Sequence, residues 1–337
     1  MRILLRPRTP FLALLLLAPS IPELLTGSTP VSELVANPAG FAVGYALDLG
    51  LYGTGALVIR EFSVILRKGW ASILLWGAAY GIAEEGFAVH TFFERSGPPV
   101  GQLAVYGSAY GVNWLWALEL TVFHATYSIA LPVLLTYLWY PTSRDRRWVD
   151  RGGLALLAGI YLDEVGSFGL LVGHGPSPAA FLLFLAISLA LVGLGATVRG
   201  DLLRPKPGPT TVGRWTLGFA GALEWVAWSF VLIVATATRL SAWLAAAAIV
   251  VANGAALAIL TRRVGALGTQ RAAYRFAVGM LLPLFLWDAV VELSIPGILL
   301  VAALFAYLLY RLGRTLDRRE RGTVPSAAAA GPPSGTS

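Results

Sequence analysis

The sequence contains no cysteine and few charged residues. The absence of cysteine excludes disulfide bonds, thiolate metal ligands and cysteine nucleophiles, so any metal site would need histidine or carboxylate ligands. Charged residues make up 13% of the 337 residues, well under the roughly 25% expected of a soluble domain, whereas hydrophobic residues reach 57%. These proportions exclude a soluble fold and indicate a protein that lies within a membrane.

The long apolar runs lack the alternation that is typical of membrane strands. Backbone N–H and C=O groups find no water in hydrocarbon, so such runs favour helices. With about 20 apolar residues per span, the sequence predicts an all-α, polytopic transmembrane helical bundle of about ten spans. The spans are expected at residues 10–26, 39–59, 70–92, 112–140, 153–172, 178–198, 215–237, 241–261, 276–294 and 296–311. This transmembrane domain is expected to cover residues 1–315, followed by a disordered cytoplasmic tail at 316–337.

The basic residues test this span count independently. Of the 25 Lys and Arg residues, all but Arg95 and Arg239 fall on one set of alternate loops. Because Lys and Arg collect in cytoplasmic loops, the pattern predicts that both termini are cytoplasmic in a protein of the cell (plasma) membrane. The net charge of +7 is then explained by contact with lipid headgroups, and no nucleic-acid partner is expected. The first helix lacks a clear signal-peptide cleavage site and is expected to be retained.

Acidic residues inside the predicted spans are the main functional signal. Ten of the 18 acidic residues lie there: Glu23, Asp48, Glu84, Glu85, Glu119, Asp163, Glu164, Glu224, Asp288 and Glu292. An ionised carboxylate is costly in hydrocarbon, so these groups must be protonated, bind a cation or line a wet cavity. Most fall between the midplane and the outer surface. The sequence therefore predicts an outward-facing acidic pocket that takes a proton, a cation or a membrane-embedded molecule.

The candidate catalytic residues are Glu84, Glu85, His124 and Asn113. Asn113 and His124 share one face of the fourth predicted helix. Glu84 and Glu85 diverge by about 100° on a straight α-helix, so they are expected to serve different neighbours. The candidate substrate- or ion-binding residues are Glu119, Asp163, Glu164, Glu224, Asp288 and Asp48. The alternative is that these acids are protonated and only hydrogen-bond between helices.

Two resemblances follow from these residues. Residues 51–57, 79–86 and 111–124 resemble an uncharacterised family of prokaryotic multi-pass membrane proteins, which implies no particular activity. The Glu84-Glu85 pair, followed about 40 residues later by His124, is also similar to the CPBP (CAAX-processing and bacteriocin-protection) intramembrane proteases. That resemblance implies that the site activates water. The chain departs from the family motifs at Val89 and Leu120, which replace an Arg and a Phe.

The sequence leaves three classes of function open. Proton- or cation-coupled transport is the preferred interpretation, because unpaired acids occur in several separate spans. The first alternative is a glutamate-dependent intramembrane protease, in which Glu84 activates water, His124 assists and Asn113 donates a hydrogen bond. The second is a non-catalytic membrane assembly or binding protein. No zinc-protease spacing supports a site built on His90 and His124, so no metal is predicted and no cofactor is indicated.

Overall fold

The computed structural model describes residues 8–93, 106–172, 175–200, 202–203, 213–262 and 270–323, and these are almost entirely helical. The helices are α1 (Arg8–Pro19), α2 (Glu33–Ala36), α3 (Pro38–Asp48), α4 (Thr54–Ile65), α5 (Trp70–Ile82), α6 (Trp114–Phe123), α7 (Leu131–Trp139), α8 (Arg151–Leu171), α9 (Pro178–Thr197), α10 (Arg214–Ser229), α11 (Thr236–Thr238), α12 (Ala242–Arg262), α13 (Gln270–Val291) and α14 (Ile298–Thr323). One short antiparallel pair, β1 (Ser108–Ala109) with β2 (Val112–Asn113), precedes α6. The predicted all-α class is confirmed.

Several of these helices are continuous with one another through π-helical turns. The described residues contain five such segments: Ser20–Leu24, Leu49–Gly53, Ala83–Ala88, His124–Ala130 and Phe230–Ala235. They extend α1 and α5 and join α3 to α4, α6 to α7, and α10 to α11. A π-helical turn adds a residue to the helix and changes the direction of the side chains around it. Two of these segments, Ala83–Ala88 and His124–Ala130, carry Glu84, Glu85 and His124.

Eight helices in the described part of the chain are long and apolar enough to cross a membrane. They are Pro38–Ile65, Trp114–Trp139, Arg151–Leu171, Pro178–Thr197, Trp215–Thr238, Ala242–Ile259, Gln270–Val291 and Ile298–Arg321. Each coincides with one of the ten predicted spans. Pro10–Leu24 is a shorter apolar helix, and the helix formed by α5 and Ala83–Ala88 is less apolar because it carries two glutamates. The chain is therefore a multi-pass membrane protein.

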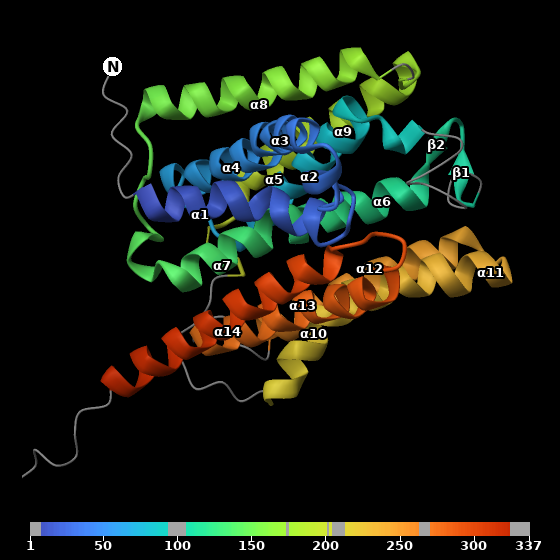
Figure 1. The fold of residues 1–337 in the computed structure, drawn as a ribbon. Coiled ribbons are helices and arrows are strands. Elements are labelled where there is room, and N and C mark those ends of the chain that lie inside the picture. Colours follow the sequence, from blue (N-terminus) through green and yellow to red (C-terminus); the bar gives the residue numbers. More distant parts are fainter. Residues whose placement is uncertain are drawn as a thin grey trace, which may run out of the picture.

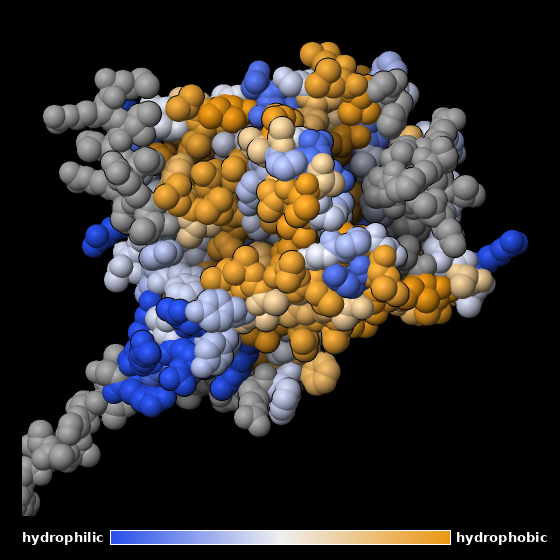
Figure 2. Space-filling view, in the orientation of Figure 1, coloured by the Kyte–Doolittle hydropathy of each residue, from blue (hydrophilic) through white to orange (hydrophobic). Residues whose placement is uncertain are grey.

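The long helices run roughly parallel and form two groups (Figure 1). α1 to α9 make up the first group, and α10 to α14 make up the second, in which α10 packs along α13 and α12. The groups meet where α13 contacts α7 and where α12 contacts α6. Figure 2 shows extensive apolar surface along the bundle and a hydrophilic patch at the end of α14. Such a broad apolar surface fits lipid rather than water.

Two sequence expectations change at the C-terminal helices. α14 continues to Thr323, past residue 315 where the helical domain was expected to end, and residues 324–337 lie outside the described residues. Glu292 lies in the turn after α13 rather than within a span. Its carboxylate accepts hydrogen bonds from the N–H groups of Gly297 and Leu299, both at 2.9 Å. These bonds lower the pKa of Glu292, which is a turn residue and not an intramembrane acid.

A buried ion pair fixes the loop between α7 and α8. Arg60 and Glu61 are adjacent on α4, contact one another and are fully buried. The Arg60 guanidinium lies 3.6 Å from the ring centre of Trp148. Glu61 Oε1 accepts a hydrogen bond from the backbone N–H of Trp148 at 3.0 Å. Trp148 is itself buried at this junction. We refer to Arg60, Glu61 and Trp148 as the loop anchor.

Candidate functional site

His124 is the centre of a buried acidic cluster. It begins the π-helical segment His124–Ala130, between α6 and α7. Its Nδ1 lies 3.1 Å from Glu84 Oε2 and 2.8 Å from Ser128 Oγ, and its Nε2 lies 2.9 Å from Glu85 Oε1. Glu84, Glu85 and His124 are exposed by only 2%, 8% and 2%. Both ring nitrogens therefore face a carboxylate in a site shielded from water. We refer to these three residues as the Glu-His-Glu cluster.

The two glutamates reach the same histidine because their helix is not a straight α-helix. Glu84 and Glu85 lie in the π-helical segment Ala83–Ala88 at the end of α5. The expectation that they serve different neighbours is wrong, since both contact His124. A wider helical turn changes the angle between adjacent side chains, and Gly81 lets the helix carrying His124 approach α5 closely. The local geometry thus depends on π-helical turns in both partner helices.

A second layer of hydrogen bonds orients Glu85. The Thr91 hydroxyl donates to Glu85 Oε2, and the Trp116 indole N–H donates to the Thr91 hydroxyl at 3.0 Å. The Asn113 amide donates to the Thr91 carbonyl at 3.4 Å. Asn113 is buried next to the site, but it is not among the described residues that line the cavity. Its amide therefore holds the Thr91 segment beside the site.

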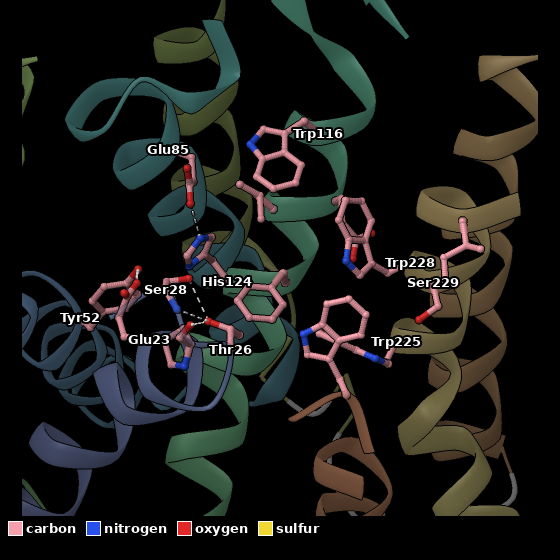
Figure 3. Close-up of a pocket in the computed structure, with 16 residues that line it drawn as sticks. Glu23, Thr26, Ser28, Tyr52, Glu85, Trp116, His124, Trp225, Trp228 and Ser229 are labelled. Carbon is pink, nitrogen blue, oxygen red and sulfur yellow. Dashed lines mark hydrogen bonds and ion pairs between the residues drawn. The ribbon is translucent and has the colours of Figure 1, made fainter. Parts of the chain in front are cut away.

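A cavity of about 300 Å³ opens beside the cluster, between the two helix groups. Figure 3 shows Glu85, His124 and Glu23 on one side, with Trp225, Trp228 and Ser229 on the other. Its described lining residues are Pro22, Glu23, Thr26, Ser28, Tyr52, Glu85, Trp116, Glu119, Leu120, Phe123, His124, Trp225, Trp228, Ser229, Ile233 and Trp287. Each of the five π-helical segments contributes at least one of them. This concentration is notable because π-helical turns frequently occur at functional sites.

A second acidic network forms one wall of this cavity. The Tyr52 hydroxyl donates to Glu23 Oε1 at 2.5 Å, and the Thr29 hydroxyl lies 2.9 Å from Glu23 Oε2 and 3.3 Å from Asp48 Oδ2. Asp48, a predicted ion-binding residue, thus joins the site indirectly through Thr29. Glu23 and Tyr52 were not predicted as site residues. The available signal was the position of Glu23 within an apolar run, directly after Pro22.

Glu119 and Glu224 form the third acidic group. Glu119 lines the cavity, is only 2% exposed, and its Oε2 has no hydrogen-bond partner. Glu224, on α10, accepts a hydrogen bond from the Thr126 hydroxyl at 2.7 Å, and its Oε1 has no partner. The two carboxyl groups are close enough for their charges to interact. Residues far apart in the sequence are therefore brought together at the junction of the two helix groups.

The remaining predicted residues lie away from the cavity. On α8, Asp163 is exposed, whereas Glu164 is half-buried next to Gly50. Asp288, on α13, is fully buried, and neither of its carboxylate oxygens has a hydrogen-bond partner. None of the three is among the described residues that line the cavity. They do not contribute to the arrangement around His124.

The ionisable side chains at the site are mainly acidic. No Lys or Arg occurs among the described residues that line the cavity, although Glu23, Glu85 and Glu119 do. Glu84, Glu85 and His124 each offer one atom that could bind a metal ion, and these atoms lie within 4.8 Å of one another. Two carboxylates and an imidazole suit a proton or a divalent transition metal. The arrangement is chemically equipped to hold positive charge.

Comparisons of the chain with protein-family models, with curated proteins and with solved structures find no match. Both resemblances noted in the sequence stay predictions. The function is therefore argued from the geometry of the cavity.

Proposed function

We propose that the protein is a proton- or cation-coupled carrier of the cell membrane, with the Glu-His-Glu cluster as its exchange site. The observation that supports this proposal is the buried contact of Glu84 and Glu85 with His124, at the wall of a cavity whose described lining contains no Lys or Arg. Buried negative charge without a cationic partner costs several kcal/mol or more. A proton or a bound cation removes that cost.

Ten spans with both termini in the cytoplasm are the topology that fits this carrier. Pro10–Leu24 and the helix from α5 through Ala88 run alongside the eight apolar helices, which supports counting them as spans. The beginning of α1 and the end of α14 lie at the same end of the bundle (Figure 1). The same end of the bundle carries the basic C-terminal part of α14. This orientation supports the proposal that the cavity lies toward the outer side.

The cluster offers a path for a proton. An imidazole can accept a proton at one nitrogen while it donates the proton of the other. Glu85 and His124 line the cavity, whereas Glu84 is not among its described lining residues and contacts the opposite ring nitrogen. A proton that enters at Glu85 passes through His124 to Glu84. When a cation binds in the cavity, the proton returns from Glu84 through His124 to Glu85 and leaves.

Infrared spectroscopy of the reconstituted protein tests this proposal. We expect carboxyl C=O bands that change with pH and with added Na⁺ or divalent metal, and that are lost in Glu84→Gln and Glu85→Gln. Asp163→Asn is the matched control, because Asp163 is exposed and away from the cavity. In vesicles loaded with a pH-sensitive dye, a cation gradient should drive proton movement by the wild type and by the control. Carboxyl bands that ignore pH and cations would contradict the proposal and leave the acids as contacts between helices.

Intramembrane hydrolysis is the second candidate, favoured by the Glu85–His124 contact of 2.9 Å at the cavity wall. Such a pair can activate a water molecule. A hydrolase predicts that Glu85→Gln and His124→Ala abolish cleavage of a membrane-embedded peptide by the purified protein. It also predicts no cation-driven proton movement, which separates it from the carrier.

A further inference from the structure

The cavity beside the Glu-His-Glu cluster also has an aromatic wall. Four of the 11 tryptophans of the chain line it: Trp116, Trp225, Trp228 and Trp287. Tyr52 and Phe123 also line the cavity. Inorganic ions and protons gain little from such a surface, so the exchange site does not explain it.

The tryptophans come from three helices that are distant in the sequence. Trp116 from α6 and Trp228 from α10 have ring centres 5.6 Å apart with planes tilted by 54°. Trp225 from α10 and Trp287 from α13 have ring centres 6.5 Å apart at 64°. In Figure 3 the labelled rings of Trp225 and Trp228 stand between the His124 side of the site and α10, and the ring of Trp116 lies nearer to Glu85. Tilted neighbours leave ring faces available to a molecule in the cavity, and those faces carry negative electrostatic potential.

Glu119 supplies an independent sign that the cavity takes a positively charged molecule. It belongs to the cavity lining, is 98% shielded from solvent, and leaves Oε2 without a hydrogen-bond partner. A buried carboxylate oxygen without a partner is costly and calls for a ligand, a proton or a water molecule. The ligand must also be small, since about 300 Å³ is at the lower end of small-molecule sites.

We infer that the cavity binds a small hydrophobic organic cation, a quaternary or tertiary ammonium, with its charge between Glu119 and the tryptophan faces. The inference rests on the proposed carrier function and names its substrate class. Aromatic rings attract ammonium groups by cation–π interaction, which is strengthened when the pair is shielded from water. The alkyl groups of the cation cover the apolar ring surface, which inorganic ions leave exposed.

One proton is released for each ammonium ion that binds. The ammonium ion enters, the Glu119 carboxylic acid loses its proton, which leaves by way of the Glu-His-Glu cluster on the same cavity, and the carboxylate pairs with the ammonium. When the cation leaves, a proton returns to the same oxygen. The titratable groups that interact with Glu119 are Glu224 from α10 and Tyr127 from the segment His124–Ala130. Glu23, Tyr52, Glu85 and His124 line the same cavity. The total charge of the cavity is unchanged through the cycle.

Calorimetry with tetraethylammonium tests the inference in full-length protein reconstituted in phosphatidylglycerol vesicles. We expect saturable binding, with about one proton released per cation when the heats in two buffers of different ionisation enthalpy are compared. Replacing Trp228 by Leu should weaken binding by about 5- to 30-fold, and replacing it by Phe by about two- to fivefold, because Phe retains a weaker ring face. Glu119→Gln should abolish proton release. Trp243→Leu is the control, since Trp243 is 85% exposed and not among the described lining residues.

A neutral ligand of the same shape makes the test specific for charge. Choline should bind, and its neutral carbon isostere dimethylbutanol should not. Equal binding of the two, or equal affinity of Trp228→Phe and Trp228→Leu with wild type, would overturn the inference. Trp225→Phe and Trp225→Leu repeat the comparison on another ring if a Trp228 variant fails to fold.

Two further outcomes separate the inference from the function on which it rests. Carboxyl bands that respond to Na⁺ without any binding of tetraethylammonium would refute the substrate class and leave the carrier proposal standing. Loss of both responses would refute both.

Phosphatidylcholine added to the vesicles distinguishes two sources of the ammonium group. Competition supports recognition of a lipid headgroup in the cavity, whereas no competition supports a soluble cation.

Discussion

The protein contains two buried charged clusters that are built in opposite ways. In the loop anchor, Arg60 and Glu61 carry opposite charges and contact one another. The Arg60 guanidinium also donates to the carbonyl groups of Ser143, Arg144 and Arg146 at 2.7–2.9 Å. The Glu-His-Glu cluster has two carboxyl groups and one imidazole, and an open cavity in place of a basic side chain.

Under the proposed function, the difference separates a structural site from a functional one. A compensated ion pair holds its neighbours in place, as the loop anchor holds the segment before α8. An excess of acid beside a cavity must respond to a proton or a cation, because ionised carboxylates are costly in a dry interior. If this comparison is valid, mutations in the first site should change stability, and mutations in the second should change exchange.

The largest effect on stability is expected from Glu61→Ala. The substitution leaves the Arg60 charge buried without its partner, which should lower the free energy of unfolding by about 3–5 kcal/mol. Denaturation of the protein in mixed micelles measures this loss. The double variant Arg60→Met, Glu61→Leu is the control: it removes both charges but also leaves three carbonyl groups and the Trp148 backbone N–H without their partners, so it should restore only part of the stability. A small effect of Glu61→Ala would remove the structural role given to the loop anchor.

An intermediate effect is expected from Gly81→Ala. A Cβ atom at residue 81 would lie 2.9 Å from the Cβ of His124, so α5 must move away from the helix that carries His124. Overpacking of this kind costs about 1–3 kcal/mol, and it should also weaken the cation response of the carboxyl bands. Gly159→Ala on α8 is the matched control, since a Cβ there meets nothing within 4 Å. It should stabilise the helix by up to about 1 kcal/mol. Equal effects would contradict the close packing at Gly81.

A smaller effect is expected from Ser128→Ala. The change removes the 2.8 Å contact of the hydroxyl with His124 Nδ1 and leaves Glu84 as the neighbour of that nitrogen. The free energy of unfolding should fall by about 1 kcal/mol, and the pH midpoint of the carboxyl bands should shift. Ser188→Ala on α9 is the control, because the Ser188 hydroxyl is buried without a hydrogen-bond partner. An unchanged midpoint in Ser128→Ala would show that the hydroxyl does not orient His124.

Sequence reasoning succeeded where the physical rule is local. Apolar length alone located the eight helices, and the cost of acids in lipid indicated Glu84, Glu85 and His124, which the structure brings into contact. It missed the shared histidine, because the π-helical turns that rotate Glu84 and Glu85 have no simple sequence pattern. It also missed the tryptophans of α10 and α13, whose places depend on packing between distant helices.

The smallest effect on stability, together with the largest on exchange, is expected from Glu85→Gln. The amide has nearly the shape of the carboxyl group, and its oxygen can still accept from Thr91 while its NH2 group donates to His124. It removes a buried carboxyl group that has no Lys or Arg partner in the described cavity lining. The free energy of unfolding should therefore change by at most about 1 kcal/mol, while the cation-dependent carboxyl bands and proton movement are lost. If Glu85→Gln instead destabilised the protein as strongly as Glu61→Ala, both clusters would be structural, and the contrast on which the carrier proposal depends would disappear.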